Sequence, residues 1–188
     1  MTAPDLHADA YRVLHDWHAP DDDQRALRQQ YLAHLDAYDD GVLRECRAGH
    51  ITASTLIVDV ARESVLLTLH PIVGRWLQTG GHCEPDDGTL LRAAAREAHE
   101  ESGIDDLTID VTPLRLDRHA VRCRPATGDP TVLDHLDVQF LALAPAYAQE
   151  TGTQESLDLR WWYWARLPDG IDASVRNLVA AARERCTP

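Results

Sequence analysis

The chain has 188 residues, a formal net charge of −13 at pH 7, and a hydrophobic fraction of 44%. This length fits one domain with an extension, and the hydrophobic fraction is sufficient for a buried core. The acidic charge argues against a nucleic-acid duplex or an anionic membrane as the main partner, because both attract basic patches.

The sequence also excludes several kinds of targeting and cross-linking. No run approaches the roughly 18 apolar residues that a membrane-spanning helix needs. Residues 1–9 carry Asp5 and Asp9 and do not resemble a signal peptide, which starts basic and continues apolar. The four cysteines lack C-x-x-C spacing, which argues against a disulfide framework or a zinc knuckle. We therefore expect a cytoplasmic protein.

The first 48 residues are predicted to form a helical extension. Apolar side chains in residues 5–17 recur at spacings of three and four, as in an amphipathic helix. Residues 19–23 form a break whose aspartates suit the N-cap of a second helix, and Asp39-Asp40-Gly41 would end that helix. We expect the pair to pack on the main domain or to build a homodimer contact, and it carries no recognisable chemistry.

Residues 49–188 are predicted to form a mixed α/β domain. Strands interleave with two helices, and this alternation is typical of a sheet covered by helices. The predicted helices span residues 89–102 and 172–184. The predicted strands span residues 51–60, 64–69, 76–78 (ending at Gly80-Gly81), 107–116, 132–144 and 161–165.

One segment, residues 80–104, concentrates the chemistry. On a helix, Glu97, Glu100 and Glu101 stand at i, i+3 and i+4, so three carboxylates share one face. Such like charges destabilise a helix by about 0.2–0.5 kcal/mol per pair. A divalent cation reverses that cost, because Mg²⁺ and Mn²⁺ prefer oxygen ligands. The alternative is an ordinary solvated acidic face, which is common on helices.

The same segment resembles the Nudix box, G-x5-E-x7-R-E-U-x-E-E-x-G-U, in which U is a bulky apolar residue. Gly81 matches its first glycine, Arg96-Glu97 its arginine–glutamate pair, and Gly103-Ile104 its end. The loop departs from the pattern, because Asp87 replaces the first glutamate and eight residues, not seven, separate it from Arg96. The U position before the paired glutamates is Ala98, a smaller residue than usual. These departures weaken the case for Asp86 and Asp87 as functional residues.

The resemblance implies a Nudix-type α/β/α sandwich with a mixed sheet. It also implies a metal-dependent hydrolase that cleaves a diphosphate bond in a nucleoside diphosphate linked to another moiety, by attack of activated water on phosphorus. Glu97, Glu100, Glu101 and the Gly81 carbonyl would then bind Mg²⁺ or Mn²⁺. Arg96 would orient the loop and a glutamate through charge-assisted hydrogen bonds.

The general base and the substrate contacts stay open from sequence alone. Glu101 is one candidate for the base, Glu155 in a distant loop is another, and Glu150 is a weaker one. Arg118 and His119, with Arg122 and Arg124 nearby, form a basic cluster that could meet substrate phosphates. The alternative is that these side chains are exposed to solvent or paired with some of the many acids. Trp76 would line the pocket or pack in the core. The expected partner is a small phosphorylated molecule.

Two other functions compete with the hydrolase. A Nudix fold could serve as a ligand-binding or regulatory module without turnover, although such a module would be expected to have a broken acid set. The Gly-His sequence at Gly81-His82 also resembles isopentenyl-diphosphate isomerases. Those enzymes have a cysteine where this chain has Gly80, and they lack the paired glutamates present here. We expect His82 to brace the loop.

Overall fold

The computed structural model describes residues 3–123, 131–151 and 157–187. Among these residues, no helix is both long and apolar enough to cross a membrane. In chain order the elements are α1 (Ala3–Asp16), α2 (Asp22–Ala37), β1 (His50–Asp59), a 3-10 turn (Val60–Arg62), β2 (Ser64–Leu69), β3 (Trp76–Leu77), β4 (Thr79–His82), α3 (Leu90–Ser102), β5 (Thr108–Ile109), β6 (Arg115–Cys123), β7 (Thr131–Leu143), β8 (Asp158–Tyr163) and α4 (Ala173–Cys186).

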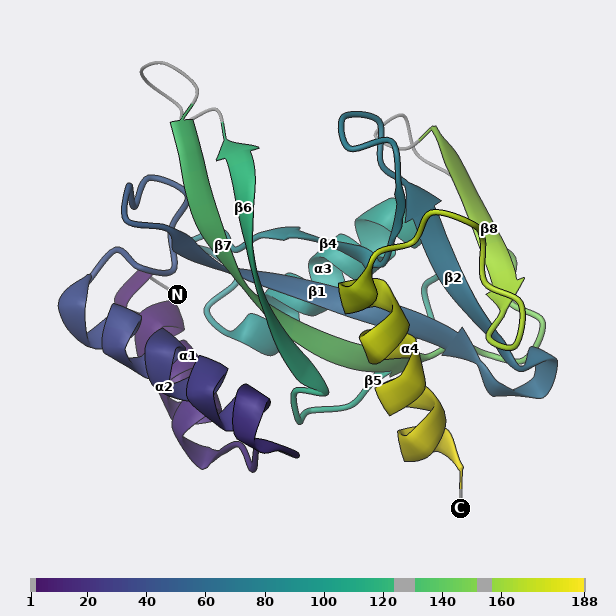
Figure 1. The fold of residues 1–188 in the computed structure, drawn as a ribbon, viewed down its shortest axis with the longest axis horizontal. Coiled ribbons are helices and arrows are strands. Elements are labelled where there is room, and N and C mark those ends of the chain that lie inside the picture. The colour runs from purple at the N-terminus through teal and green to yellow at the C-terminus, as the bar shows by residue number, and fades with distance from the viewer. Residues whose placement is uncertain (1–2, 124–130, 152–156, 188) are drawn as a thin grey trace.

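The eight strands form one mixed sheet around β1, which is buried along its whole length. One edge of β1 pairs in parallel with β7. The other edge of β1 pairs with two strands: β4 pairs with the first half of β1, and β2 pairs with the second half. The sheet therefore splays, with the β6–β7 pair and the β2–β8 pair at opposite ends of β1 (Figure 1).

Helices cover both faces of the sheet, which confirms the predicted α/β/α sandwich. On one face, Ile51 and Ala53 of β1 share a core cluster with residues of α1, α2 and α3. On the other, Leu56 and Val58 pack with the apolar side of α4, led by Val175. Figure 1 shows α3 behind β1 and α4 in front of it. The alternation of side chains along a strand explains this division.

The N-terminal helices are fastened to the domain by buried polar contacts. Gln24 accepts a hydrogen bond from the Leu116 N–H at 2.7 Å and donates one to the Leu116 carbonyl at 3.0 Å, as a neighbouring strand would. Asp9 of α1 accepts the N–H of Leu90, the first residue of α3, at 2.9 Å. These contacts and the shared core join residues on both sides of position 48. The proposed division into a 1–48 extension and a 49–188 domain therefore stays a prediction.

Replacing Gln24 by Ala is expected to lower the free energy of unfolding by about 1–3 kcal/mol. The substitution leaves the N–H and carbonyl of Leu116 buried without the amide that satisfies them. Denaturant unfolding followed by circular dichroism measures the change. Gln29→Ala, an exposed position on the same helix, is the matched control. Equal stability of the two variants would contradict the proposed role.

The sequence misplaced two strand boundaries. Gly80 and Gly81 were expected to end a strand, but they lie inside β4 and pair with Ser54 and Ala53 of β1. A single strand was expected over residues 107–116. Two strands form instead, β5 and β6, separated by a segment that contains Pro113. Proline lacks the N–H that a strand interior needs, and this explains the interruption.

Candidate active site

The site is organised by α3, which the sequence caps at both ends. The Thr89 side chain accepts a hydrogen bond from the Arg92 N–H at 3.2 Å, as an N-cap residue does. Gly103 ends the helix in the left-handed conformation, with φ of 66°, which favours glycine. Ala94 and Ala98 are buried against the sheet. The acidic face of the helix is thereby held beside β4 and the loop that follows it.

Arg96 joins the loop to the helix. Its guanidinium donates two hydrogen bonds of 3.0 Å to Asp87, one of 2.9 Å to Glu97 and one of 3.1 Å to Glu100. It also donates to the His82 carbonyl at 2.9 Å. The hydrogen bond to Asp87 is the largest of the influences that raise the pKa of Arg96 above its ordinary value. Arg96 therefore lies where the resemblance expects it, between the loop and two glutamates.

Asp87 stabilises the loop, whereas sequence analysis had left open whether this residue has any functional role. It is buried, and besides the two bonds from Arg96 it accepts the Glu84 N–H at 2.7 Å. A fork-to-fork pair between a guanidinium and a carboxylate is geometrically specific. The shorter aspartate side chain thus closes the loop with the same arginine even though one extra residue separates the two.

Glu97 lies directly against the backbone of Gly81. A Cβ atom built on Gly81 would come within 2.7 Å of the Glu97 carboxyl carbon and of both its oxygens, so a larger residue there would force that carboxylate to move. Glu101 lies close by, since its carboxylate accepts the Gly80 N–H at 3.4 Å. Burial raises the pKa of Glu97 above its usual value. A partly buried carboxylate that faces a strand backbone, with two more acids on the same helix, is suited to a cation.

The donors gathered here fit a hard divalent cation. Glu97, Glu100 and Glu101 offer carboxylate oxygens and the backbone at Gly81 offers a carbonyl oxygen, which are the ligands that Mg²⁺ and Mn²⁺ take. The acids differ in exposure: the Glu97 side chain is 16% exposed and that of Glu100 56%. Arg96 bridges both, so it holds the acidic pair in place although their charges repel.

Replacing Gly81 by Ala is expected to lower kcat/KM by at least about tenfold, because the new methyl group would displace the Glu97 carboxylate. A displacement of about 1 Å in a catalytic group is enough for losses up to 100-fold. Steady-state kinetics at saturating Mg²⁺ measures the effect. The control is Gln29→Ala, at an exposed position on α2, which should retain the kcat/KM of the unaltered chain. Unchanged turnover in Gly81→Ala would contradict the close approach.

The structure brings one of the candidate bases to the site. Glu101 is partly buried and adjoins β4. Glu150 is engaged elsewhere, because it accepts the indole N–H of Trp161 at 2.8 Å. Glu155 lies outside the described residues. Cys83 is buried, and this burial raises the pKa of its thiol, which disfavours the thiolate that a nucleophile needs.

Arg118 and His119, two of the residues predicted to bind substrate, form hydrogen bonds with neighbouring side chains. Arg118 lies on β6 and pairs with Asp134 at 2.5 Å and Gln30 at 2.9 Å. His119, also on β6, bonds Asp117 at 2.7 Å, and this bond raises the pKa of the imidazole. Arg118 and His119 thus have the acidic partners that sequence analysis offered as the alternative, and their contact with substrate stays a prediction. Arg124 lies outside the described residues.

Trp76 packs against the core, which is one of the two alternatives considered for it, and its contact with substrate stays a prediction. Its ring meets that of Trp162 edge-on, with centroids 5.2 Å apart, and both pack on the core beneath α4. The pair also lines an open hollow together with the turn at residues 163–169. An aromatic wall of this kind suits the flat face of a base.

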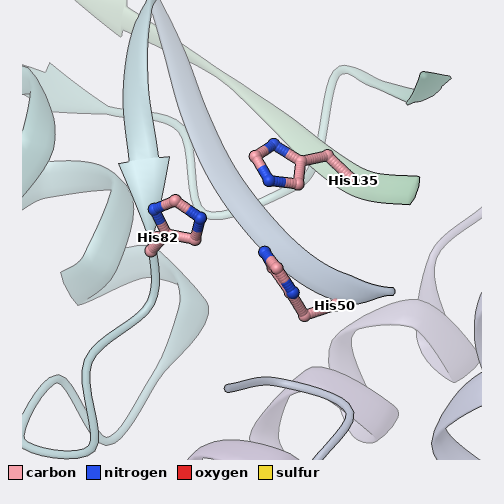
Figure 2. Close-up of side chains that lie close together, drawn as sticks. All are labelled: His50, His82 and His135. Carbon is pink, nitrogen blue, oxygen red and sulfur yellow. The ribbon is translucent and has the colours of Figure 1, made fainter. Parts of the chain in front are cut away.

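Sequence analysis missed a cluster of histidines formed by His50, His82 and His135. They come from β1, β4 and β7, and their rings face one another (Figure 2). Burial lowers the pKa of His82 to about 4 and that of His135 to about 2, so both rings are neutral at pH 7. His82 was expected to brace the loop; instead its side chain joins this cluster. The spacing of residues 50, 82 and 135 gives no local signal.

Comparison with known proteins identifies the fold and its family. The profile of the NUDIX domain matches residues 49–184, which is most of the chain. The chain therefore belongs to the NUDIX domain family, and we assign it to the Nudix hydrolases. Enzymes of this family generally need divalent metal ions and act on nucleoside diphosphate-linked substrates. No curated protein sequence matches the chain.

Several solved structures share the fold. A NUDIX-family hydrolase from Clostridium perfringens is 23% identical, covering 73% of this chain and 95% of that one, with a TM-score of 0.55. The NUDIX domain of Shewanella oneidensis NrtR, complexed with ADP ribose, is 24% identical over 85% and 98%, with a TM-score of 0.56. The dihydroneopterin triphosphate pyrophosphohydrolase of E. coli is 24% identical over 69% and 91%, with a TM-score of 0.53.

Proposed function

We propose that this chain is a metal-dependent hydrolase that cleaves a diphosphate bond in a nucleoside diphosphate linked to another moiety, by attack of water on phosphorus. The observation that carries the proposal is the position of the Glu97 carboxylate against the Gly81 backbone, with Glu100 and Glu101 one turn further along the same helix. This arrangement favours a hard cation for two reasons. The negatively charged acids repel one another without a cation, and the proposed metal ligands are all oxygen atoms.

Mg²⁺ is the proposed cofactor, with Mn²⁺ as the alternative. When bound, such an ion would act as a Lewis acid that offsets the negative charge of the phosphates and lowers the pKa of bound water. The chain itself contributes positioning. Arg96 holds Glu97 and Glu100 through short hydrogen bonds and fixes the loop through Asp87. Glu101 is the proposed general base, because its partly buried carboxylate lies beside β4, where it accepts the Gly80 N–H at 3.4 Å.

The substrate is proposed to be a small phosphorylated molecule. With a net charge of −13, the protein needs local cations to receive a diphosphate, and the oxygen-lined site beside Arg96 provides a place for them. The related structures suggest compounds to test but do not decide between them. A cytoplasmic location, proposed from the spacing of the cysteines, and a homodimer contact through α1 and α2 stay predictions.

The experiment that tests the function is product release from a panel of diphosphate compounds by the full chain. The panel contains ADP-ribose, a dinucleoside polyphosphate, coenzyme A, NADH, a sugar nucleotide, an oxidised nucleotide and dihydroneopterin triphosphate. Each is assayed with Mg²⁺, with Mn²⁺ and with a chelator. We expect cleavage of one class, dependent on metal. In ¹⁸O-labelled water the label should appear in a phosphate product, since water attacks phosphorus.

Two outcomes would replace the proposal. Saturable binding of a panel member without turnover, at any metal concentration, would identify a ligand-binding module. Isopentenyl diphosphate is assayed alongside the panel, and its conversion to the isomer with the diphosphate intact would identify an isomerase. Circular dichroism and gel filtration of the same preparation establish that the protein assayed is folded.

A further inference from the structure

The three clustered histidines arise from strand pairing. His50 of β1 is the register partner of His135 of β7, and Thr52, two residues along β1, is the partner of His82 of β4. Residues two apart on a strand share a face, as do register partners, so all three side chains project from the same face of the sheet. The ring centroids are 4.8 to 5.0 Å apart (Figure 2).

This cluster is separate from the carboxylate site. Successive side chains on a strand point to opposite faces. Gly81 faces Glu97 of α3, so its neighbour His82 points to the other side of β4. The face that carries the histidines also carries Thr52, which donates to Asp137 at 3.0 Å. The two groups of side chains are thus divided by the sheet.

The environment of His50 distinguishes the cluster from an ordinary packed core. The His50 side chain is fully buried, and neither ring nitrogen has a partner that meets hydrogen-bond geometry among the described residues. Buried polar groups are normally satisfied, so a fully buried ring with one nitrogen close to two other imidazoles is suited to a shared ligand. One ligand nitrogen from each of the three rings lies within 4.8 Å of the others.

We propose that His50, His82 and His135 bind one transition-metal ion of the zinc class through their ring nitrogens. Neutral imidazole is a preferred ligand of Zn²⁺, Cu²⁺, Ni²⁺ and Fe²⁺, whereas the oxygen site across the sheet suits Mg²⁺. Zn–N bonds of about 2.0–2.1 Å place tetrahedral ligand nitrogens about 3.3 Å apart. Since the ligand nitrogens lie within 4.8 Å of one another, the rings are expected to move together by up to about 1.5 Å on binding.

Three protein ligands leave one position open, the pattern of zinc sites that also hold water or a substrate group. Arg44 lies close enough to act electrostatically on all three rings. Its positive charge opposes a bare cation and favours an anionic fourth ligand, such as hydroxide or a phosphate oxygen. The ion is thus expected to bind together with an anion.

Isothermal titration with Zn²⁺, in excess Mg²⁺ and with inorganic phosphate present, tests the proposal on the chelator-stripped full chain. We expect one zinc ion per chain. Changes around a metal site that spare its ligands typically cost 10- to 100-fold in affinity. His82→Gln and His135→Gln remove ligands, so each should weaken binding by more than about 100-fold. Glu97→Gln and the exposed control His15→Gln should bind zinc as the unaltered chain does.

X-ray absorption at the zinc edge keeps the test decisive if a histidine variant fails to fold. In the unaltered chain we expect three nitrogen ligands of imidazole type at about 2.0–2.1 Å. An oxygen-only shell, the absence of zinc binding, loss of binding in Glu97→Gln, or full binding by folded His82→Gln would each overturn the proposal.

Discussion

Replacing Glu97 by Gln is expected to lower kcat/KM for the hydrolysed substrate by at least about 100-fold. Gln keeps the size of the side chain but removes the negative charge that faces Gly81. A metal ion contributes several kcal/mol of charge stabilisation in the transition state, and each 1.36 kcal/mol lost is a tenfold loss of rate. Steady-state kinetics with increasing Mg²⁺ measures the effect, which should include a higher Mg²⁺ requirement.

The matched control is Glu184→Gln, which removes the same charge from an exposed position on α4. This variant should retain the kcat/KM and the Mg²⁺ requirement of the unaltered chain. If both variants lost activity equally, the loss would follow from net charge and not from the site. A Glu97→Gln enzyme with unaltered kinetics would contradict a catalytic cation at this position.

Replacing Arg96 by Met is expected to lower the free energy of unfolding by about 3 kcal/mol. The Asp87 side chain is 6% exposed and that of Arg96 22%, so removing the guanidinium leaves a buried carboxylate without its main partner. Breaking a buried ion pair from one side has this order of cost. Glu97 and Glu100 lose their shared donor at the same time, so activity should fall as well. Denaturant unfolding measures the first effect and kinetics the second.

Two further variants test whether the broken ion pair with Asp87 causes the loss of stability in Arg96→Met. Arg92→Met changes an exposed arginine one turn earlier on α3 and should cost little. Adding Asp87→Asn to Arg96→Met should recover part of the lost stability, because the uncompensated charge is then absent. Equal stability of Arg96→Met and Arg92→Met would contradict the stabilising role of the ion pair between Arg96 and Asp87.

The sequence predicted the site helix well because its determinants are local. The acids at positions 97, 100 and 101 fix one face by helical periodicity alone. Gly103 takes the left-handed C-cap conformation that its position predicted. The contact between Gly81 and Glu97 was expected from the resemblance but not from spacing, since it depends on how α3 docks on the sheet.

Features that depend on strand register escaped prediction. Sequence analysis left open whether the basic residues of β6 meet substrate or pair with acids, and the pairing of β6 with β7 sets Arg118 beside Asp134. The histidine cluster needs β1 to lie between β4 and β7 in one register, and a shift by one residue would turn each ring to the other face. A single sequence contains no local signal for that register.

The most direct test of the account is the rate of product release from the cleaved panel compound as Mg²⁺ is varied, comparing the unaltered chain with Glu100→Gln. The account predicts a rate that saturates with Mg²⁺, falls to background with chelator, and is at least about 100-fold lower in the variant. Equal cleavage with chelator present, or equal rates for a folded Glu100→Gln protein, would contradict a carboxylate metal centre on α3.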